Sequence, residues 1–165
     1  MSDRDAAFQA YFAARSDALR GTAYLLCGDW HRAEDLVQQS FTKLYLAWGR
    51  LGRHEALDGY TRQILVRTFL SERRRGWFRF ESASDEVADA AAPPGGHPEE
   101  RVVLLEALAK VPPKQRACLV LRYWEDLSIE QTAAVLKCSG GTVKSQAARG
   151  LQTLRGLLSE QERVR

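Results

Sequence analysis

The sequence has few cysteines and histidines, three of each. The cysteines are odd in number and widely separated, which excludes a disulfide framework and gives no zinc pattern. Cys27 and His31 have the helical spacing of two metal ligands, but no third ligand lies nearby, and a buried thiol beside a surface imidazole explains them better. No metal and no other cofactor is therefore expected.

Long apolar runs are also missing. No stretch is long enough to span a bilayer, and the first 20 residues are charged and lack the apolar core of a signal peptide. These two absences predict a cytoplasmic protein without membrane contact.

Catalytic patterns are missing as well. There is no Ser/His/Asp arrangement and no phosphate-binding glycine loop, and His31, His54 and His97 lie in separate segments. An enzyme, for example a helical hydrolase, is the alternative of another class, and the sequence disfavours it.

Charge is distributed unevenly along the 165 residues. Residues 81–100 carry six Asp or Glu and no Lys or Arg, and they contain Pro-Pro-Gly-Gly, whereas the flanking segments are basic. This composition is typical of a flexible linker. We therefore predict an all-α protein of two small helical domains, residues 1–80 and 101–165, joined by an acidic linker at residues 81–100.

The first domain shows helical periodicity in three segments. A helix over residues 6–26 is expected to end at Gly28, and Asp29 can cap the next helix. That helix has apolar residues on one side and exposes a leucine among polar residues on the other, which suggests a partner surface. The outer residues are Asp35, Gln38, Gln39, Thr42 and Leu46.

A basic helix is predicted for residues 60–75. Arg73, Arg74 and Arg75 are followed directly by Trp77, Phe78 and Phe80. Basic residues interleaved with aromatics suit single-stranded nucleic acid, because charge meets phosphates and flat rings stack on unpaired bases. A solvated basic face explains this composition equally well.

The segment 121–158 has the pattern of a helix-turn-helix. Ser128 and Gln131 form a capping box that starts a first helix near Ile129. Gly140 and Gly141 are expected to supply the unusual backbone angles of the corner. The second helix places Val143, Ala147 and Gly150 on one face and short polar or basic side chains on the other.

That outer face carries groups that hydrogen-bond phosphates and base edges. An ordinary helical hairpin with a solvated face is the simpler alternative. The short first helix, tight corner and longer second helix favour a recognition helix for the major groove.

Several segments together resemble one family. These segments are similar to bacterial RNA polymerase sigma factors of the extracytoplasmic-function (ECF) group, and their pattern resembles that of the actinobacterial SigE-like subgroup. The segments are EDLVQQSFTKLY, the basic SERRR segment, the acidic linker and VPPKQRACLVLRYWEDLSIEQTAAVLKCSGGTVKSQAARGLQTLR. The resemblance spans nearly the whole chain and implies a subunit that directs promoter recognition, −10 melting and initiation. A free-standing helix-turn-helix regulator is the alternative within DNA binding.

The resemblance also implies roles for residues. The outer face of the second helix would bind the clamp coiled coil of the polymerase, through Asp35, Gln38, Gln39, Thr42 and Leu46. The −10 element would be held by Tyr60, Arg62, Arg67, Thr68, Ser71, Arg73 and Arg74. The −35 element would be contacted by Arg122, Thr142, Lys144, Ser145, Gln146 and Arg149. Arg67 stands where the subgroup usually has Asn, so a different −10 preference is expected.

The implied partners are core RNA polymerase, through its clamp and flap, and promoter DNA, both duplex and melted non-template strand. The acidic linker would follow the RNA exit channel. Members of the family are commonly bound by an anti-sigma factor, so the resemblance allows an anti-sigma factor as a further partner. The protein is expected to be a monomer when free.

Overall fold

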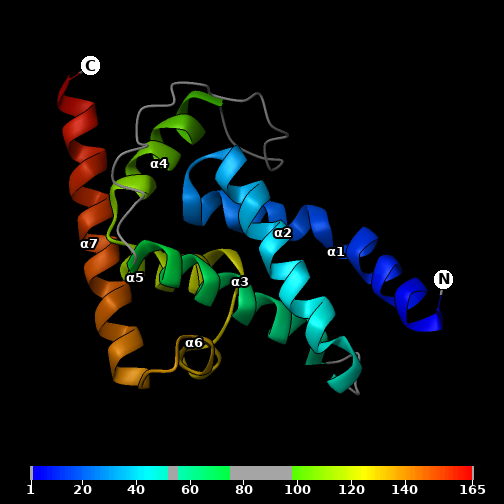
Figure 1. Cartoon of the computed structure of the whole chain (residues 1–165). Coiled ribbons are helices and arrows are strands. Elements are labelled where there is room, and N and C mark those ends of the chain that lie inside the picture. The colour runs from blue at the N-terminus through cyan, green and yellow to red at the C-terminus, as the bar shows by residue number, and fades with distance from the viewer. Residues whose placement is uncertain (1, 52–55, 75–97, 165) are drawn as a thin grey trace.

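The computed structural model describes residues 2–51, 56–74 and 98–164, and every element in these ranges is helical (Figure 1). The predicted all-α class is confirmed. Several predicted features lie outside the described residues: Arg75, Trp77, Phe78, Phe80 and residues 81–97 of the predicted linker, and also the side chains of Arg73 and Arg74.

None of the described helices is both long and apolar enough to cross a membrane. The helices are α1 (Asp3–Cys27), α2 (Trp30–Ala47), η1 (Trp48–Arg50), α3 (Leu57–Arg74), α4 (Pro98–Lys110), α5 (Pro113–Leu119), η4 (Val120–Trp124), α6 (Ile129–Leu136) and α7 (Gly140–Val164).

The N-terminal half, α1 to α3, is built on a hairpin of α1 and α2. Gly28 ends α1 in the left-handed conformation at φ 73°, which costs a glycine little, and its amide donates to the carbonyl of Tyr24. Asp29 then caps α2, because its side chain accepts hydrogen bonds from the amides of His31 and Arg32. Both predictions at this corner are confirmed. The bend lets Phe12 of α1 meet Phe41 of α2 edge to face, with ring centroids 4.6 Å apart.

The C-terminal half, α4 to α7, is organised along α7, which runs past α4, α5 and α6 (Figure 1). Close packing of α5 against α7 depends on Gly150, since a Cβ there would lie 3.1 Å from the side chain of Leu119. On α4 the buried residues are Ala107 and Leu108, whereas Ala109 is exposed.

The corner between α6 and α7 differs from the prediction. The capping box of Ser128 and Gln131 is present, and α6 begins at Ile129 as expected. The left-handed residue is Lys137, at φ 54°, whereas Gly140 already begins α7. Gly140 serves close packing instead, because a Cβ at this position would lie 3.3 Å from the side chain of Ile129.

The two halves pack on each other. One apolar cluster includes Leu26, Leu65 and Phe69 from the N-terminal half and Leu121 and Val135 from the C-terminal half. Helix α3 lies against α6, and α1 lies against α4. This contact was not predicted, and it covers Val135 of α6. Ile129, Ala133 and Leu136 of the same helix are only partly buried.

Candidate nucleic-acid interface

The first part of α7 presents the polar face that the sequence predicts. Ser139 accepts a hydrogen bond from the Thr142 amide at 3.1 Å and so fixes the first turn of the helix. Val143 and Ala147 are buried beneath it. The exposed residues of this face are Thr142, Lys144, Ser145 and Arg149, with Gln146 partly buried at its edge. A rigid helix thus holds these side chains where a duplex can reach them.

Arg122 does not belong to this exposed face. It is partly buried in the middle of η4, and its Nη1 donates a hydrogen bond to the Leu127 carbonyl at 2.5 Å. The bond closes the turn that leads into α6. In this arrangement Arg122 stabilises the turn before α6 and does not lie on the exposed face of the helix-turn-helix.

Two of the predicted −10 residues of α3, Arg62 and Arg67, contact the C-terminal half. Arg62 Nε lies 3.2 Å from Oε2 of Glu125, and the two side chains are mostly buried. Arg67 Nε donates to the Val135 carbonyl at 3.2 Å. Tyr60 and Ser71 are partly buried, and Thr68, at 4% exposure, accepts a hydrogen bond from Lys43 Nζ. The structure therefore brings this set together on one helix but covers its two described arginines.

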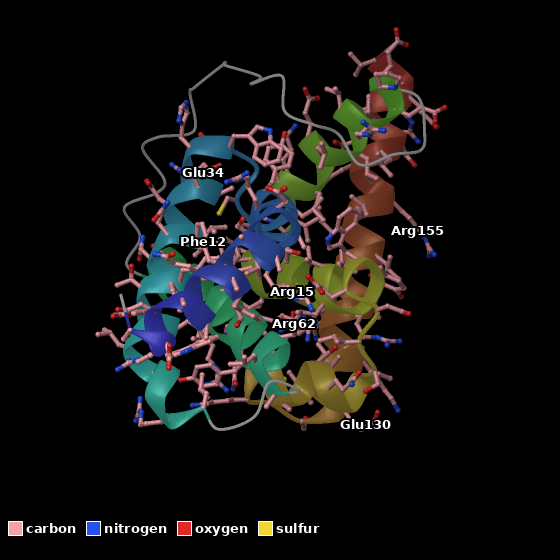
Figure 2. The ribbon with its side chains drawn as sticks, turned by 90° about the vertical axis from the view of Figure 1, so that its right-hand side faces the viewer. Phe12, Arg15, Glu34, Arg62, Glu130 and Arg155 are labelled. Atoms are coloured by element: carbon pink, nitrogen blue, oxygen red, sulfur yellow. The ribbon has the colours of Figure 1, made fainter. Side chains whose placement is uncertain are left out.

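The start of α3 is held by a polar network from α1. Tyr11 donates to Asp58 at 2.8 Å, and Arg15 pairs with the same carboxylate at 3.0 Å. Burial raises the pKa of Tyr11 to about 12. Arg15 and Arg62 line one cavity of about 210 Å³ beside Glu125, where α1, α3 and the end of η4 meet (Figure 2). Both arginines already have carboxylate partners there, so the cavity offers no free cation.

The predicted polymerase-binding face lies on the opposite side of α2 from the core. Leu36, Val37, Phe41 and Leu44 of this helix are buried. Leu46 is 72% exposed, and the polar residues of the face are exposed with it: Asp35, Gln38, Gln39 and Thr42. This face therefore holds one exposed apolar side chain among polar ones, as the helical spacing predicts.

Two residues that matter for the arrangement were not predicted as sites. Glu125 bridges the halves, because Thr22 Oγ1 donates to its Oε1 at 2.6 Å while Arg62 holds its other oxygen. Arg116, at 2% exposure, joins α5 to the carbonyl at the end of α1. Neither contact has a signal in the sequence, since each joins segments more than 60 residues apart.

Comparisons with known proteins agree with this architecture. The model of sigma-70 region 2 matches residues 11–79, and that of sigma-70 region 4 matches residues 101–154. The RNA polymerase sigma-E factor of Streptomyces avermitilis is 34% identical over 160 residues, covering 94% of this chain and 87% of the relative. The chain belongs to the ECF sigma factors.

Other relatives of this sigma factor support the assignment. The sigma-E factor of Streptomyces coelicolor is also 34% identical, covering 90% of this chain and 84% of the relative. In three dimensions, the sigma factor RpoE of Bartonella quintana, solved in complex with the anti-sigma factor NepR, matches with a TM-score of 0.74 and 28% identity, covering 92% of this chain and 96% of that one. CnrH, solved with the cytosolic domain of CnrY, shares the fold at a TM-score of 0.65 and 22% identity, over 94% of this chain and 90% of that one.

Membership of this family decides between the two DNA-binding alternatives. The protein is a transcription initiation factor rather than a free-standing regulator, because both sigma regions are present in one chain. Sigma factors are regulatory subunits, not enzymes. Within the described residues no group of three His, Cys, Asp or Glu is placed to hold a metal ion.

Proposed function

We propose that three surfaces of this sigma factor each make a different contact during transcription initiation. The outer face of α2 binds the clamp of core RNA polymerase, α3 with the following basic segment holds the melted −10 element, and the start of α7 reads the −35 duplex. The observation that carries the proposal is the separation of these surfaces on three helices, one bearing an exposed leucine and two bearing basic residues.

Each surface has the chemistry that its partner requires. Extruding a base from the stack costs a few kcal/mol, which cationic contacts to the backbone and a pocket for the base must offset. The arginines of α3 supply charge for this task. Short hydroxyls, an amide and the Arg149 guanidinium on α7 suit phosphates and base edges of a major groove. The acidic linker, which ends where α4 begins at Pro98, would lie in the RNA exit channel, and the C-terminal half would also contact the flap.

We extend the proposal to an anti-sigma factor. The similarity to the Bartonella sigma factor covers both halves and includes their relative placement, since it extends over 92% of the chain at a TM-score of 0.74. That relative was solved in complex with the anti-sigma factor NepR, so a protein of this kind would find a similar surface on this chain. Co-expression with small proteins encoded beside this gene, followed by co-purification, tests this part.

The clamp surface is tested by Leu46→Asp. A carboxylate in the middle of this face must be desolvated against the apolar side of a partner, so co-purification with core polymerase should be lost. Val164→Asp is the matched control, because Val164 is also highly exposed, at 87%, but lies at the far end of α7. Circular dichroism should show both variants folded. Retained polymerase binding by Leu46→Asp would show that α2 is not the clamp surface.

A further inference from the structure

Lys137 has an unusual backbone conformation at the corner between α6 and α7. Its φ is 54°, in the left-handed region, where the Cβ of an L residue crowds the following carbonyl. Glycine is the usual residue at such a helix end, and asparagine or aspartate can offset part of the strain through a short local hydrogen bond. A lysine side chain has neither advantage. The corner therefore holds a residue whose conformation is unfavourable and whose side chain does nothing locally to relieve it.

The backbone around Lys137 is held firmly. Its amide and that of Cys138 both donate to the Ala133 carbonyl at the end of α6. Two residues further on, the Ser139 hydroxyl is hydrogen-bonded to the amide and to the hydroxyl of Thr142, in the first turn of α7. The turn itself thus sets the conformation of Lys137 and leaves its side chain exposed.

The charge around this corner is of one sign. Residues 131–159 carry no Asp or Glu, whereas their basic residues are Lys137, Lys144, Arg149 and Arg155. Within the part of the chain that the structure describes, no ion pair or hydrogen bond of the Lys137 ammonium is found. A lysine in this state is a point charge on a flexible four-carbon stem, which is a form in which proteins bind phosphate.

The corner also lies where the edge of a DNA groove would be. An α-helix with its side chains is about 10–12 Å across and the major groove is about 12 Å wide, so a helix that enters the groove fills it. Residues just before the first turn then lie beside the phosphates that border the groove. The Cα of Lys137 is within about 8 Å of that of Ser139, the residue that caps α7, so its stem can extend to this row of phosphates.

We propose that Lys137 is a positioning residue of the −35 interface: its ammonium binds a DNA phosphate at the edge of the major groove and sets how α7 enters it, although its backbone conformation destabilises the free protein. The proposal rests on the proposed function of α7. Phosphates carry no sequence information directly, so the contribution of Lys137 to affinity is the same for every base sequence. Replacement by glycine should therefore shift stability and DNA binding in opposite directions.

The test uses three variants of the full-length protein. Lys137→Gln removes the charge but keeps the Cβ and a long side chain, and Lys137→Gly removes the charge and relieves the backbone. Lys110→Gln is the matched control, because Lys110 is an exposed lysine of the same half that lines a cavity with Leu157. Leu157 lies about 25 Å along α7 from Gly140. Helix α6 lies beside the start of α7 and α4 beside its later turns (Figure 1).

Thermal melting of the free protein reports the backbone conformation. Lys137→Gly should melt about 2–4 °C higher than the wild type, since glycine adopts a positive φ without strain. Lys137→Gln keeps the Cβ and should melt at the same temperature as the wild type. A glycine variant that melts no higher would contradict the proposal, because the lysine would then sit at this corner without strain.

Competition binding of promoter duplex to purified holoenzyme, at several salt concentrations, reports the phosphate contact. We expect both Lys137 variants to bind about three- to tenfold more weakly, and the dependence of log K on log salt to become shallower by about one unit. Single-base variants of the −35 element should keep their order of affinity. Lys110→Gln should stay within about twofold of the wild type with an unchanged salt dependence, because its charge is screened at this distance.

Three outcomes would overturn the contact: unchanged binding by Lys137→Gln, an altered order of the single-base variants, or equal losses from Lys137→Gln and Lys110→Gln. The first removes the contact, the second makes Lys137 a reader of bases, and the third leaves only overall charge. Failure of the α7 assignment is distinguishable, because Arg149→Ala would then leave binding unchanged as well. If only Lys137 is assigned wrongly, Arg149→Ala still weakens binding in the same assay.

Discussion

The guanidinium of Arg116 donates a hydrogen bond from Nη1 to the carbonyl of Leu26 at 2.5 Å, across 90 residues of sequence. The same side chain donates to the carbonyls of Ala109 and Val111. One buried cation in α5 therefore satisfies the carbonyl of Leu26 near the end of α1 and the carbonyls of Ala109 and Val111 at the end of α4. The ends of α1 and α4, one from each half, thus meet at this residue of α5.

Arg116→Lys should destabilise the protein although it keeps the charge. A lysine ammonium is a point donor and cannot reach carbonyls spread around a planar guanidinium, so buried acceptors lose their partners. We expect a loss of about 2–4 kcal/mol in the free energy of unfolding, measured by urea denaturation.

Arg155→Lys is the control for this substitution. Arg155 is exposed on α7 and points away from the body of the molecule in Figure 2, so its replacement should change stability by less than about 0.5 kcal/mol. Equal stability of Arg116→Lys and the wild type would show that the guanidinium contacts do not hold the halves together.

Local signals in the sequence predicted much of the fold. The Gly28 and Asp29 corner and the capping box at Ser128 were found because each depends on residues within four positions. The contact of Arg62 with Glu125 was not found, because 63 residues separate them and nothing in the periodicity of either helix specifies the other. Lys137 was missed for another reason: Gly140 and Gly141 were the stronger candidates for a left-handed residue, whereas in the structure Gly140 serves close packing instead.

The candidate site was predicted to a similar extent. Helical spacing alone placed Thr142, Ser145 and Arg149 on an exposed face, and the structure exposes them. Spacing could not show that Arg67 is covered, since its own helix leaves it on a polar side and only the docked α6 hides it. A sequence pattern does not show how the two halves pack against each other, and so it cannot show which residues of the site this packing covers.

Cys118 should resist thiol reagents while the protein is folded. Burial raises the pKa of this thiol to about 11, so little reactive thiolate is present at pH 8. We expect Cys138, which is partly exposed, to react faster with Ellman's reagent, and Cys118 to react only in urea, where its pKa returns to about 8.5. Peptide mapping after a short exposure identifies the modified residues. Rapid modification of Cys118 in the native protein would mean that α5 separates from its neighbours readily.

The same pKa shift has a consequence for stability. Because the folded pKa of Cys118 lies above the unfolded value, the neutral thiol favours folding fully below about pH 8.5. That contribution should decline as the pH rises through 9 toward 11, where the unfolded thiol ionises first. Cys118→Ala should remove this part of the pH dependence, although the raised pKa of Tyr11 adds its own decline at still higher pH.

The role proposed for α7 depends on the side chain of Arg149. It is exposed on the first half of the helix, and within the described residues no ion pair or hydrogen bond of its guanidinium is found. Arg155 lies six residues further along, so at 100° per residue it projects from another side of the same helix. The two arginines carry the same charge on one element and differ in the face that they occupy.

Arg149→Ala should weaken binding of holoenzyme to a −35 duplex by about 1–3 kcal/mol if the guanidinium reads a base edge, and the preference at one base pair should then be relaxed. If it contacts only a phosphate, binding should weaken evenly for all sequences, and the dependence of log K on log salt should become shallower by about one unit. Competition assays against a set of single-base variants at several salt concentrations separate these outcomes. Arg155→Ala removes the same charge and should leave both the preference and the salt dependence close to those of the wild type. Equal effects of the two substitutions would mean that α7 attracts DNA only through its overall charge, and the recognition face would have to be sought elsewhere.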